Sequence, residues 1–392
     1  MKSHKHYLVA VICALALLSD GRTASGQTAA PTIPLVPGLT IVIAAHDTPP
    51  ADAPRSTIVQ NIAQGDSELV VTVTGVDARG IDEVTSIEGV DDNRRPLQLT
   101  IRRHVLAADL AGSHVQVLGF HTDDSSEIAG TTSLGPSLAI MRELKTAGRT
   151  AYSVIPFLRL PTSTGTLTRV GSATMPIPVL INGRRTELPA IRVTGQLTYN
   201  STRDNSKRVR PWEQYIFDDP KHPLTLRLSY GADGDRDASK PIFTREVVKI
   251  DFPAREVVTI EESLTKSCRV EMPGIYFDVD LATLKPASNR ALTTIAELLR
   301  KQPQWRLSIE GHTDNTGGDA HNEDLSTRRA AAVKAALVRD FAVASGRLTS
   351  AGFGERRPVE ANNTMAGRAR NRRVELVRDC SGKPTSAAQP SK

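Results

Sequence analysis

An arginine in the middle of an apolar helical stripe is the first indication of a binding site. The sequence predicts a helix over residues 320–342, whose apolar side chains recur at steps of four or eight: Leu325, Val333, Leu337 and Phe341. Arg329 falls in this stripe, where a guanidinium is unfavourable unless it meets an anion. Asn322 and Ser326 share nearly the same face, close to the helix N-terminus, whose free N–H groups also favour negative charge. We therefore expect a site for a carboxylate or a phosphate.

A carboxylate lies just upstream, after a predicted strand over residues 307–309. Asp314 belongs to the run GHTDNTG at residues 311–317, and loops at strand ends beside helix N-termini are common ligand sites. Two interpretations are open. Asp314 pairs directly with Arg329 and locks the loop, or both side chains face one ligand that carries an ammonium and a carboxylate. In the second case Asp314 would bind the ammonium, and Arg329 would bind the carboxylate through two parallel hydrogen bonds.

An enzyme would need a nucleophile with its base, or a set of metal ligands. His312 and Asp314 alternate at the strand end and would share a face, and His321 follows a few residues later, so a metal pair is conceivable. No paired catalytic carboxylates and no activated serine stand out. We expect a binding module without cofactor or metal, and a metal-dependent hydrolase is the alternative.

The elements that would position these residues alternate between strands and helices. Past Cys268 we expect a strand at 269–277, a helix at 286–301, the strand at 307–309, the helix at 320–342, and strands at 348–351 and 374–377. This β-α-β-α-β-β order predicts a mixed sheet with helices packed on it. The fold class is therefore α+β, with this C-terminal domain at residues 263–380.

Four motifs in this region resemble the OmpA-like peptidoglycan-binding domain, which is the C-terminal domain of OmpA, MotB and Pal proteins. They are GHTD at 311–314, NEDLSTRRA at 322–330, GFGERRP at 352–358 and GRARNRRVE at 367–375, in the family's order. The second motif is similar to the N-x-x-L-S-x-x-R-A signature of the family. The resemblance covers less than a third of the chain.

The resemblance implies a domain that binds the meso-diaminopimelate of peptidoglycan stem peptides non-covalently. That residue carries an ammonium and a carboxylate on one carbon. In the family, an aspartate after the second strand and an arginine of the following helix hold these two charges, and they match Asp314 and Arg329. Thr316, Asn322 and Arg372 match positions that often add polar or cationic contacts. One further match, Asp280, is weaker because its position varies in type.

The basic run around Arg372 has a second interpretation. Arg368, Arg370, Arg372 and Arg373 could form a solvated face that attracts the anionic wall weakly and at long range. At helical spacing Arg368 and Arg372 share a face that Arg370 does not, so only some of the four could reach a ligand.

The region from residue 39 to 262 is predicted to be a β-rich, sandwich-like domain, and it resembles no family that we can name. Short β-branched runs are separated by turn residues, and the strand candidates are 39–43, 68–74, 97–101, 115–118, 179–181 and 224–228. One helix is expected at 136–147. Residues 161–176 mark a place where this domain could divide into two halves.

The N-terminus predicts an export signal at residues 1–26. Lys2 and Lys5 precede an apolar run at 8–18, and Ala24-Ser25-Gly26 supplies the small residues of a cleavage site. A run of this length is too short to span a bilayer, which disfavours an ion-motor stator. Residues 27–38, rich in Thr, Ala and Pro, are predicted to be a linker, and residues 381–392 a disordered tail.

The two cysteines that follow the signal are predicted to form a disulfide. An exported chain is oxidised, and Cys268 and Cys380 are the pair that remains once Cys13 is removed with the signal. Two inert buried thiols are the alternative. A metal site is poorly supported, because neither cysteine has a second ligand at the usual spacing.

Composition and motifs together define the expected function. Nucleic acid is disfavoured despite the net charge of +6, because only 4% of residues are aromatic and no basic stripe with stacking rings occurs. We expect a non-catalytic periplasmic protein that binds peptidoglycan and anchors its β-rich domain or the outer membrane to the wall. Outer-membrane association and an envelope protein bound through the β-rich domain are open. The alternative is a periplasmic metal-dependent hydrolase acting on peptidoglycan.

Overall fold

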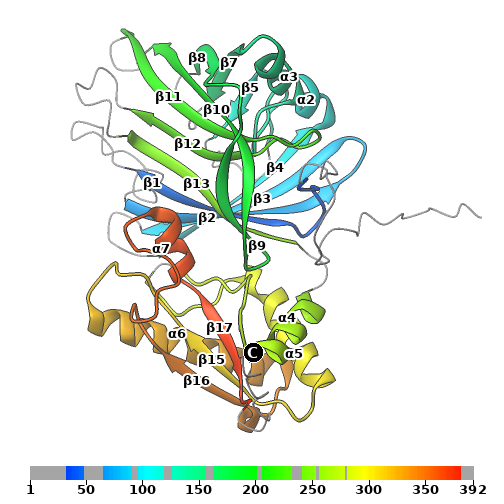
Figure 1. The fold of residues 1–392 in the computed structure, drawn as a ribbon, viewed down its shortest axis with the longest axis vertical. Helices are drawn as coiled ribbons and strands as arrows, with labels where there is room; N and C mark the ends of the chain where they lie inside the picture. The colour runs from blue at the N-terminus through cyan, green and yellow to red at the C-terminus, as the bar shows by residue number, and fades with distance from the viewer. Residues whose placement is uncertain are drawn as a thin grey trace, which may run out of the picture. The chain divides into compact units, whose positions relative to one another are not determined.

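The computed structural model describes residues 32–47, 65–90, 96–118, 126–155, 162–200, 205–231, 241–252, 256–278 and 280–380. The predicted signal peptide and the predicted tail lie outside the described residues. Two sheets, drawn in Figure 1, belong to one compact unit of the chain that begins at Thr32. Among the described residues, no helix has both the length and the apolar character needed to cross a membrane.

The larger sheet contains 13 strands of the described chain. They are β1 (Thr40–Asp47), β2 (Gly65–Val76), β3 (Gly80–Val90), β4 (Pro96–Leu106), β5 (Val115–Val117), β6 (Ser126–Glu127), β7 (Arg149–Ile155), β8 (Ser163–Arg169), β9 (Met175–Ile181), β10 (Arg184–Asn200), β11 (Lys207–Phe217), β12 (Thr225–Gly231) and β13 (Pro241–Asp251). Their order is β5-β7-β8-β10-β11-β12-β13-β1-β2-β3-β4-β6, and β9 pairs with β10 and β13. The expected β-rich region is confirmed. Its strands continue through one sheet on both sides of residues 161–176.

Two apolar clusters pack on this sheet, and a helix covers one of them. The helix α3 (Leu138–Thr146) begins at Ser137, whose hydroxyl accepts a hydrogen bond from the Ile140 N–H. Its buried residues join Tyr152 and Trp212 in the core, and Figure 1 shows α3 and the short helix α2 (Ala107–Gly112) beside β5 and β7. The predicted helix at 136–147 is confirmed.

Part of the predicted linker is packed in the second apolar cluster. Ile33 and Leu35 are 1% and 7% exposed and lie among β1, β9 and β13 residues. The Ile33 N–H donates to the Asp219 carboxylate at 2.8 Å. The Pro and Thr content of residues 27–38 masked this apolar pair in the sequence, because each apolar residue stands alone between turn formers.

The smaller sheet has the predicted βαβαββ order. Its elements are β14 (Arg269–Glu271), η1 (Pro286–Ser288), α5 (Asn289–Lys301), β15 (Leu307–Gly311), α6 (Asp319–Phe341), η2 (Ser345–Arg347), β16 (Leu348–Gly352), α7 (Met365–Asn371) and β17 (Val374–Arg378). The strand order is β14-β17-β15-β16, with β15 parallel to β16 and antiparallel to β17. The first strand ends earlier than the predicted residue 277, because Pro273 and Gly274 form a turn.

Helices α5 and α6 bury apolar stripes against this sheet. Leu292, Ile295 and Leu299 of α5 are at most 1% exposed, and they share a core with Val333 and Leu337 of α6. The helix α4 (Glu256–Lys266) adds Ile260 and Leu264 to the same core. The C-terminal packing unit therefore includes residues before 263, where the sequence placed the boundary.

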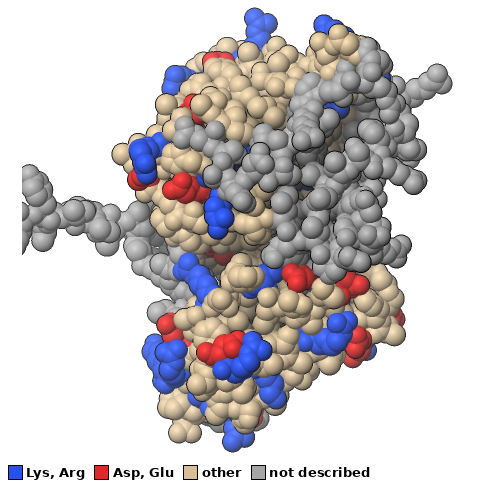
Figure 2. All heavy atoms as spheres, turned by 180° about the vertical axis from the view of Figure 1, so that it is seen from behind, with Lys and Arg blue, Asp and Glu red and all other residues tan. Residues whose placement is uncertain are grey.

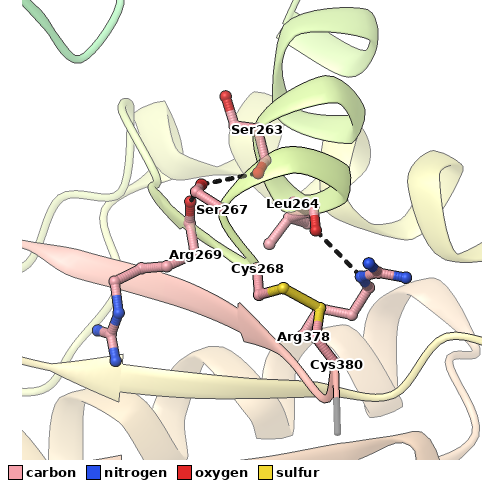
Figure 3. The surroundings of a disulfide bond; sticks show 7 residues. All are labelled: Ser263, Leu264, Ser267, Cys268, Arg269, Arg378 and Cys380. Carbon is pink, nitrogen blue, oxygen red and sulfur yellow. Dashed lines mark hydrogen bonds between the residues drawn. A yellow bond between two sulfur atoms is a disulfide. The ribbon is translucent and has the colours of Figure 1, made fainter. Parts of the chain in front are cut away.

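A disulfide joins Cys268 and Cys380, as predicted, with the two Cα atoms 6.2 Å apart. Figure 3 shows that it ties the residue before β14 to the segment after β17. Beside it, the Arg378 Nε donates to the Leu264 carbonyl at 3.0 Å. The bond therefore closes the ends of the smaller sheet and sits against the end of α4.

Candidate ligand-binding site

A cavity of about 390 Å³ opens beside the end of β15 and the first turns of α6. Its volume falls within the roughly 300–1,000 Å³ of typical ligand pockets. All six site residues named from the sequence line it: Asp280, Asp314, Thr316, Asn322, Arg329 and Arg372. The structure therefore brings together residues that are up to 92 positions apart in the sequence.

Asp314 provides a buried carboxylate at the floor of the loop after β15. The residue is 4% exposed, and its Oδ1 accepts a hydrogen bond from the Thr316 N–H at 2.8 Å. Its Oδ2 forms an ion pair with the Arg372 guanidinium. The arginine that neutralises Asp314 in this structure is therefore Arg372, and no ion pair joins Asp314 to Arg329 in the described chain.

Arg329 is held by neutral acceptors. Its Nε donates to the Leu281 carbonyl at 2.9 Å and its Nη2 to the Asp278 carbonyl at 3.2 Å. The guanidinium carbon lies 5.0 Å from the centre of the Phe277 ring. Burial lowers the pKa of Arg329 to about 10, and the Glu68 carboxylate opposes that shift most strongly. The guanidinium stays cationic at neutral pH, and among the described residues no carboxylate is hydrogen-bonded to it. It can therefore donate hydrogen bonds to the carboxylate of a ligand.

Arg372 bridges two carboxylates. Besides Asp314, its guanidinium contacts Glu68 of β2, with Nη2 and Oε1 2.7 Å apart. Burial alone would lower the pKa of Arg372, but Glu68 and Asp314 raise it above the ordinary value. The sequence identified Arg372 as a cation of the site, whereas its partner Glu68 is 304 positions away in another sheet.

Asn322 fixes the loop, and Ser326 faces away from the cavity. The Asn322 amide donates to the Asp314 carbonyl at 3.2 Å and to the Glu355 carboxylate at 2.7 Å. Ser326 is fully buried; its hydroxyl donates to the Glu323 carbonyl and accepts from the Gly354 N–H. The expected donor patch therefore serves the packing of α6 on its neighbouring loops, and only Asn322 of the two lines the cavity.

Thr316 and Asp280 lie at the exposed side of the cavity. Thr316 is exposed, and its backbone N–H is bound to Asp314. The Asp280 carboxylate lies 2.6 Å from His321 Nε2, and both side chains are largely exposed. Asp280 therefore pairs with His321 in the first turn of α6. From the sequence, His321 was considered only as a metal ligand.

The basic run of residues 368–373 does not form a solvated face. Arg370 is 3% exposed and binds the Glu360 carboxylate and the Pro178 carbonyl, while Arg373 binds Glu375 at 2.6 Å. Arg372 and Arg373 line the cavity. On the face drawn in Figure 2, Lys and Arg side chains are interspersed with Asp and Glu. Arg370, Arg372 and Arg373 are thus internal ion-pair partners, and Arg368 donates to the Asn362 carbonyl at 3.1 Å.

The metal set considered in the sequence does not assemble around Asp314. His312 groups with Glu310 and Glu375, whose ligand atoms lie within 4.8 Å of one another. Both carboxylates are already bound by arginines: Arg269 contacts each of them, and Arg373 and Arg357 each contact one. A further cation would meet their guanidinium groups at close range. This cluster of Glu310, His312 and Glu375 therefore does not fit a metal ion.

His312 itself is a buried neutral imidazole. It is 2% exposed, its ring stacks on Phe353 with centroids 5.5 Å apart, and neither ring nitrogen has a hydrogen-bond partner. Burial, followed by the nearby Arg373, lowers its pKa to about 4. It is therefore a poor general base for a hydrolase at neutral pH.

Three residues of the larger sheet complete the cavity. Val42 of β1, Glu68 of β2 and Lys249 of β13 line it opposite the loop residues. An apolar cluster joins the two sheets beside it: Val42, Ala44, Val70 and Val248 meet Tyr276, Ala366 and Ala369. Glu68 and Lys249 could not be recognised as site residues from the sequence, because nothing in a strand pattern indicates which distant loop the strand will face.

The smaller sheet and its helices form a compact α+β domain with a charged cavity beside it. Residues 276–372 match the model of the OmpA family. Outer membrane porin F of Pseudomonas aeruginosa is 39% identical over 127 residues, which are 32% of this chain and 36% of that protein. The peptidoglycan-binding protein ArfA of Mycobacterium tuberculosis is 42% identical over 107 residues, 26% of this chain and 31% of that protein.

A solved structure, the peptidoglycan-associated lipoprotein from Burkholderia pseudomallei, is 32% identical with a TM-score of 0.25 and covers 26% of this chain and 87% of that one. The chain therefore carries an OmpA family domain at its C-terminus. It spans about a third of the length of these curated relatives. The family match begins at residue 276, after the last strand of the larger sheet.

Proposed function

We propose that this protein is a periplasmic, non-catalytic wall-binding protein whose OmpA family domain holds peptidoglycan stem peptides. The ligand group is the free end of meso-diaminopimelate, with its ammonium on Asp314 and its carboxylate on Arg329. The larger sheet would be the cargo that is anchored to the wall, or would contact an outer-membrane or other envelope protein.

The observation that carries the proposal is the pair of opposite charges in one open cavity. Asp314 and Arg329 both line it without bonding to each other, and the hydrogen bonds of Arg329 go to carbonyl groups. A zwitterion on one carbon can satisfy both charges at once. Thr316 and Asp280 at the exposed side offer polar contacts to the rest of a peptide. The names of the relatives, which include a peptidoglycan-binding protein and outer membrane proteins, support the same ligand and location.

Binding to the polymer does not require a strong single contact. Charge-assisted hydrogen bonds contribute roughly 1.5–3 kcal/mol each. Peptidoglycan repeats the ligand many times, so that a second attachment through the larger sheet would raise the overall affinity by avidity.

The first prediction concerns Arg329. Replacing it with alanine removes the carboxylate partner, so we expect the affinity for diaminopimelate-type sacculi to fall roughly 10- to 100-fold. Co-sedimentation with purified sacculi measures this. Wild-type protein should also bind less to sacculi whose stem peptides carry lysine, because lysine lacks the second carboxylate.

The matched control is Arg328→Ala, one position earlier on α6. Arg328 is largely exposed, pairs with Asp324 and does not line the cavity. It should pellet with sacculi like the wild type. If Arg329→Ala pelleted equally well while folded, the assignment of the site would be wrong.

A further inference from the structure

The larger sheet places an acidic side chain inside the same cavity. Glu68 of β2 lines it together with Asp314 and Arg329, and its Oε1 lies 2.7 Å from Arg372 Nη2. The side chain is 28% exposed and reaches the cavity across the boundary between the two sheets. We propose that Glu68 is an internal competitor of the ligand carboxylate, which weakens wall binding while the larger sheet is docked; this inference rests on the proposed function.

The surroundings of Glu68 are those of a bound anion. Burial would raise the pKa of Glu68, but Arg372, Lys249 and Lys285 lower it below its ordinary value. Both lysines line the cavity with it. Glu68 is also the carboxylate that acts most strongly on Arg329. The Glu68 carboxylate therefore already interacts with the cationic side chains that would attract a ligand carboxylate.

Competition follows from the number of negative charges near the two arginines. Arg372 already contacts Asp314 and Glu68, and both carboxylates interact electrostatically with Arg329. A ligand whose carboxylate binds Arg329 would bring a further carboxylate into this partly buried space, beside those of Glu68, Asp280 and Asp314. Like charges at short range in such a place repel appreciably. Removing the charge of Glu68 should therefore favour the ligand.

The docking contact that carries Glu68 is limited and polar at its edges. The apolar cluster that joins the sheets contains small side chains, with alanines at three of its seven positions. Around it lie the Arg185–Glu360 ion pair at 2.7 Å and the Lys249–Glu271 ion pair at 3.5 Å. Contacts of this kind between parts of a chain are expected to open more easily than a hydrophobic core. Opening of the contact between the sheets would withdraw Glu68 from the cavity, so that Arg329 and Arg372 could bind the ligand carboxylate without competition.

The test, and the second prediction, is Glu68→Gln in the full chain, which keeps the shape of the side chain and removes its charge. Titration with a tripeptide that ends in meso-diaminopimelate should show binding about three- to fivefold tighter than wild type, as the loss of one partly exposed charge allows. The difference should shrink at 0.5 M salt, because screening weakens the repulsion.

The matched control is Arg185→Gln, which removes an ion pair between the sheets outside the cavity. Its affinity should stay within about twofold of wild type, because the loss of one partly exposed ion pair leaves Glu68 in the cavity. Unchanged or weaker binding by Glu68→Gln would overturn the competition; weaker binding would mean that Glu68 helps by drawing Arg372 away from Asp314. If neither wild type nor Glu68→Gln bound the tripeptide, the proposed function itself would fail.

Discussion

Arg329 and Arg372 line the same cavity, yet only one of them is free to take a carboxylate. Arg372 is neutralised by Asp314 and Glu68, whereas Arg329 donates to the carbonyls of two residues. In the proposed function, the ligand carboxylate would therefore bind Arg329. The ligand ammonium would share Asp314 with Arg372, so the position of Arg372 would set how strongly the ammonium is held.

The sequence could predict Arg329 and Asp314 because their types conflict with their positions, whereas Thr316, Arg372 and Asp280 came from the family resemblance. An arginine in the apolar stripe of α6 and an aspartate after a strand both need a charged partner. It could not predict which charges meet, since Arg372 reaches Asp314 from the end of α7 and Glu68 reaches Arg372 from another sheet. Motif spacing shows which residues need a charged partner, but it does not show which residue that partner is.

The third prediction, at the same scale, concerns His312 and pH. Its pKa is about 4 in the folded protein against an ordinary 6.5, so below pH 6.5 the unfolded chain binds a proton that the folded chain does not. The contribution of His312 to the free energy of unfolding is therefore fully present above pH 6.5 and is lost as the pH falls toward 4. The loss is up to about 3 kcal/mol.

Denaturant titrations of wild type and His312→Gln at pH 7 and pH 4.5 measure this contribution. Groups common to both proteins cancel, so the variant should lose about 1–3 kcal/mol less than wild type on acidification. Equal losses in the two proteins would show that His312 is not held neutral by the fold.

At the scale of elements, glycines let α6 lie directly on the smaller sheet. A Cβ at Gly311, the last residue of β15, would come within 2.3 Å of the Ser326 carbonyl oxygen, and one at Gly352 of β16 within 2.3 Å of the Thr327 backbone. Both contacts fall in the turn of α6 that leads to Arg329. The glycines therefore set the height of the arginine above the sheet.

The fourth prediction follows from this close approach. Gly311→Ala should destabilise the protein by about 1–3 kcal/mol and weaken sacculus binding, because α6 must move to admit the methyl group. Gly346→Ala is the control, since a Cβ there meets nothing within 4 Å. Chemical denaturation and co-sedimentation of both variants provide the measurements; equal behaviour would mean that α6 can shift without cost.

The elements of the smaller sheet were predictable, whereas much of the larger sheet was not. In the C-terminal part, apolar residues recur with helical or strand periods and Pro303 ends α5 cleanly. In β10 and β11, arginine, glutamate and proline interrupt the apolar alternation, and long-range pairing supplies the strand. The helix α7 also escaped prediction, because the buried Arg370 meets its partner Glu360 only in the folded chain.

For the whole molecule, the question is whether the two sheets unfold together. The disulfide closes a separation of 112 residues that contains the smaller sheet, and the larger sheet lies outside that loop. The chain has two tryptophans, Trp212 in β11 and Trp305 before β15. Each sheet therefore has its own fluorescent reporter.

The fifth prediction is that the disulfide stabilises mainly the C-terminal part of the chain, which contains the smaller sheet. Replacing Cys268 and Cys380 with serine should lower the unfolding free energy reported by Trp305 by about 2–5 kcal/mol, because the unfolded loop gains freedom. Trp212 should report an unchanged midpoint, because the small contact between the sheets is expected to open before either core. Single-tryptophan variants, Trp212→Phe and Trp305→Phe, each compared with and without the cysteines, separate the two signals. Equal shifts at both tryptophans would show that the sheets unfold as one unit, and the docked position of Glu68 would then be as stable as the fold itself.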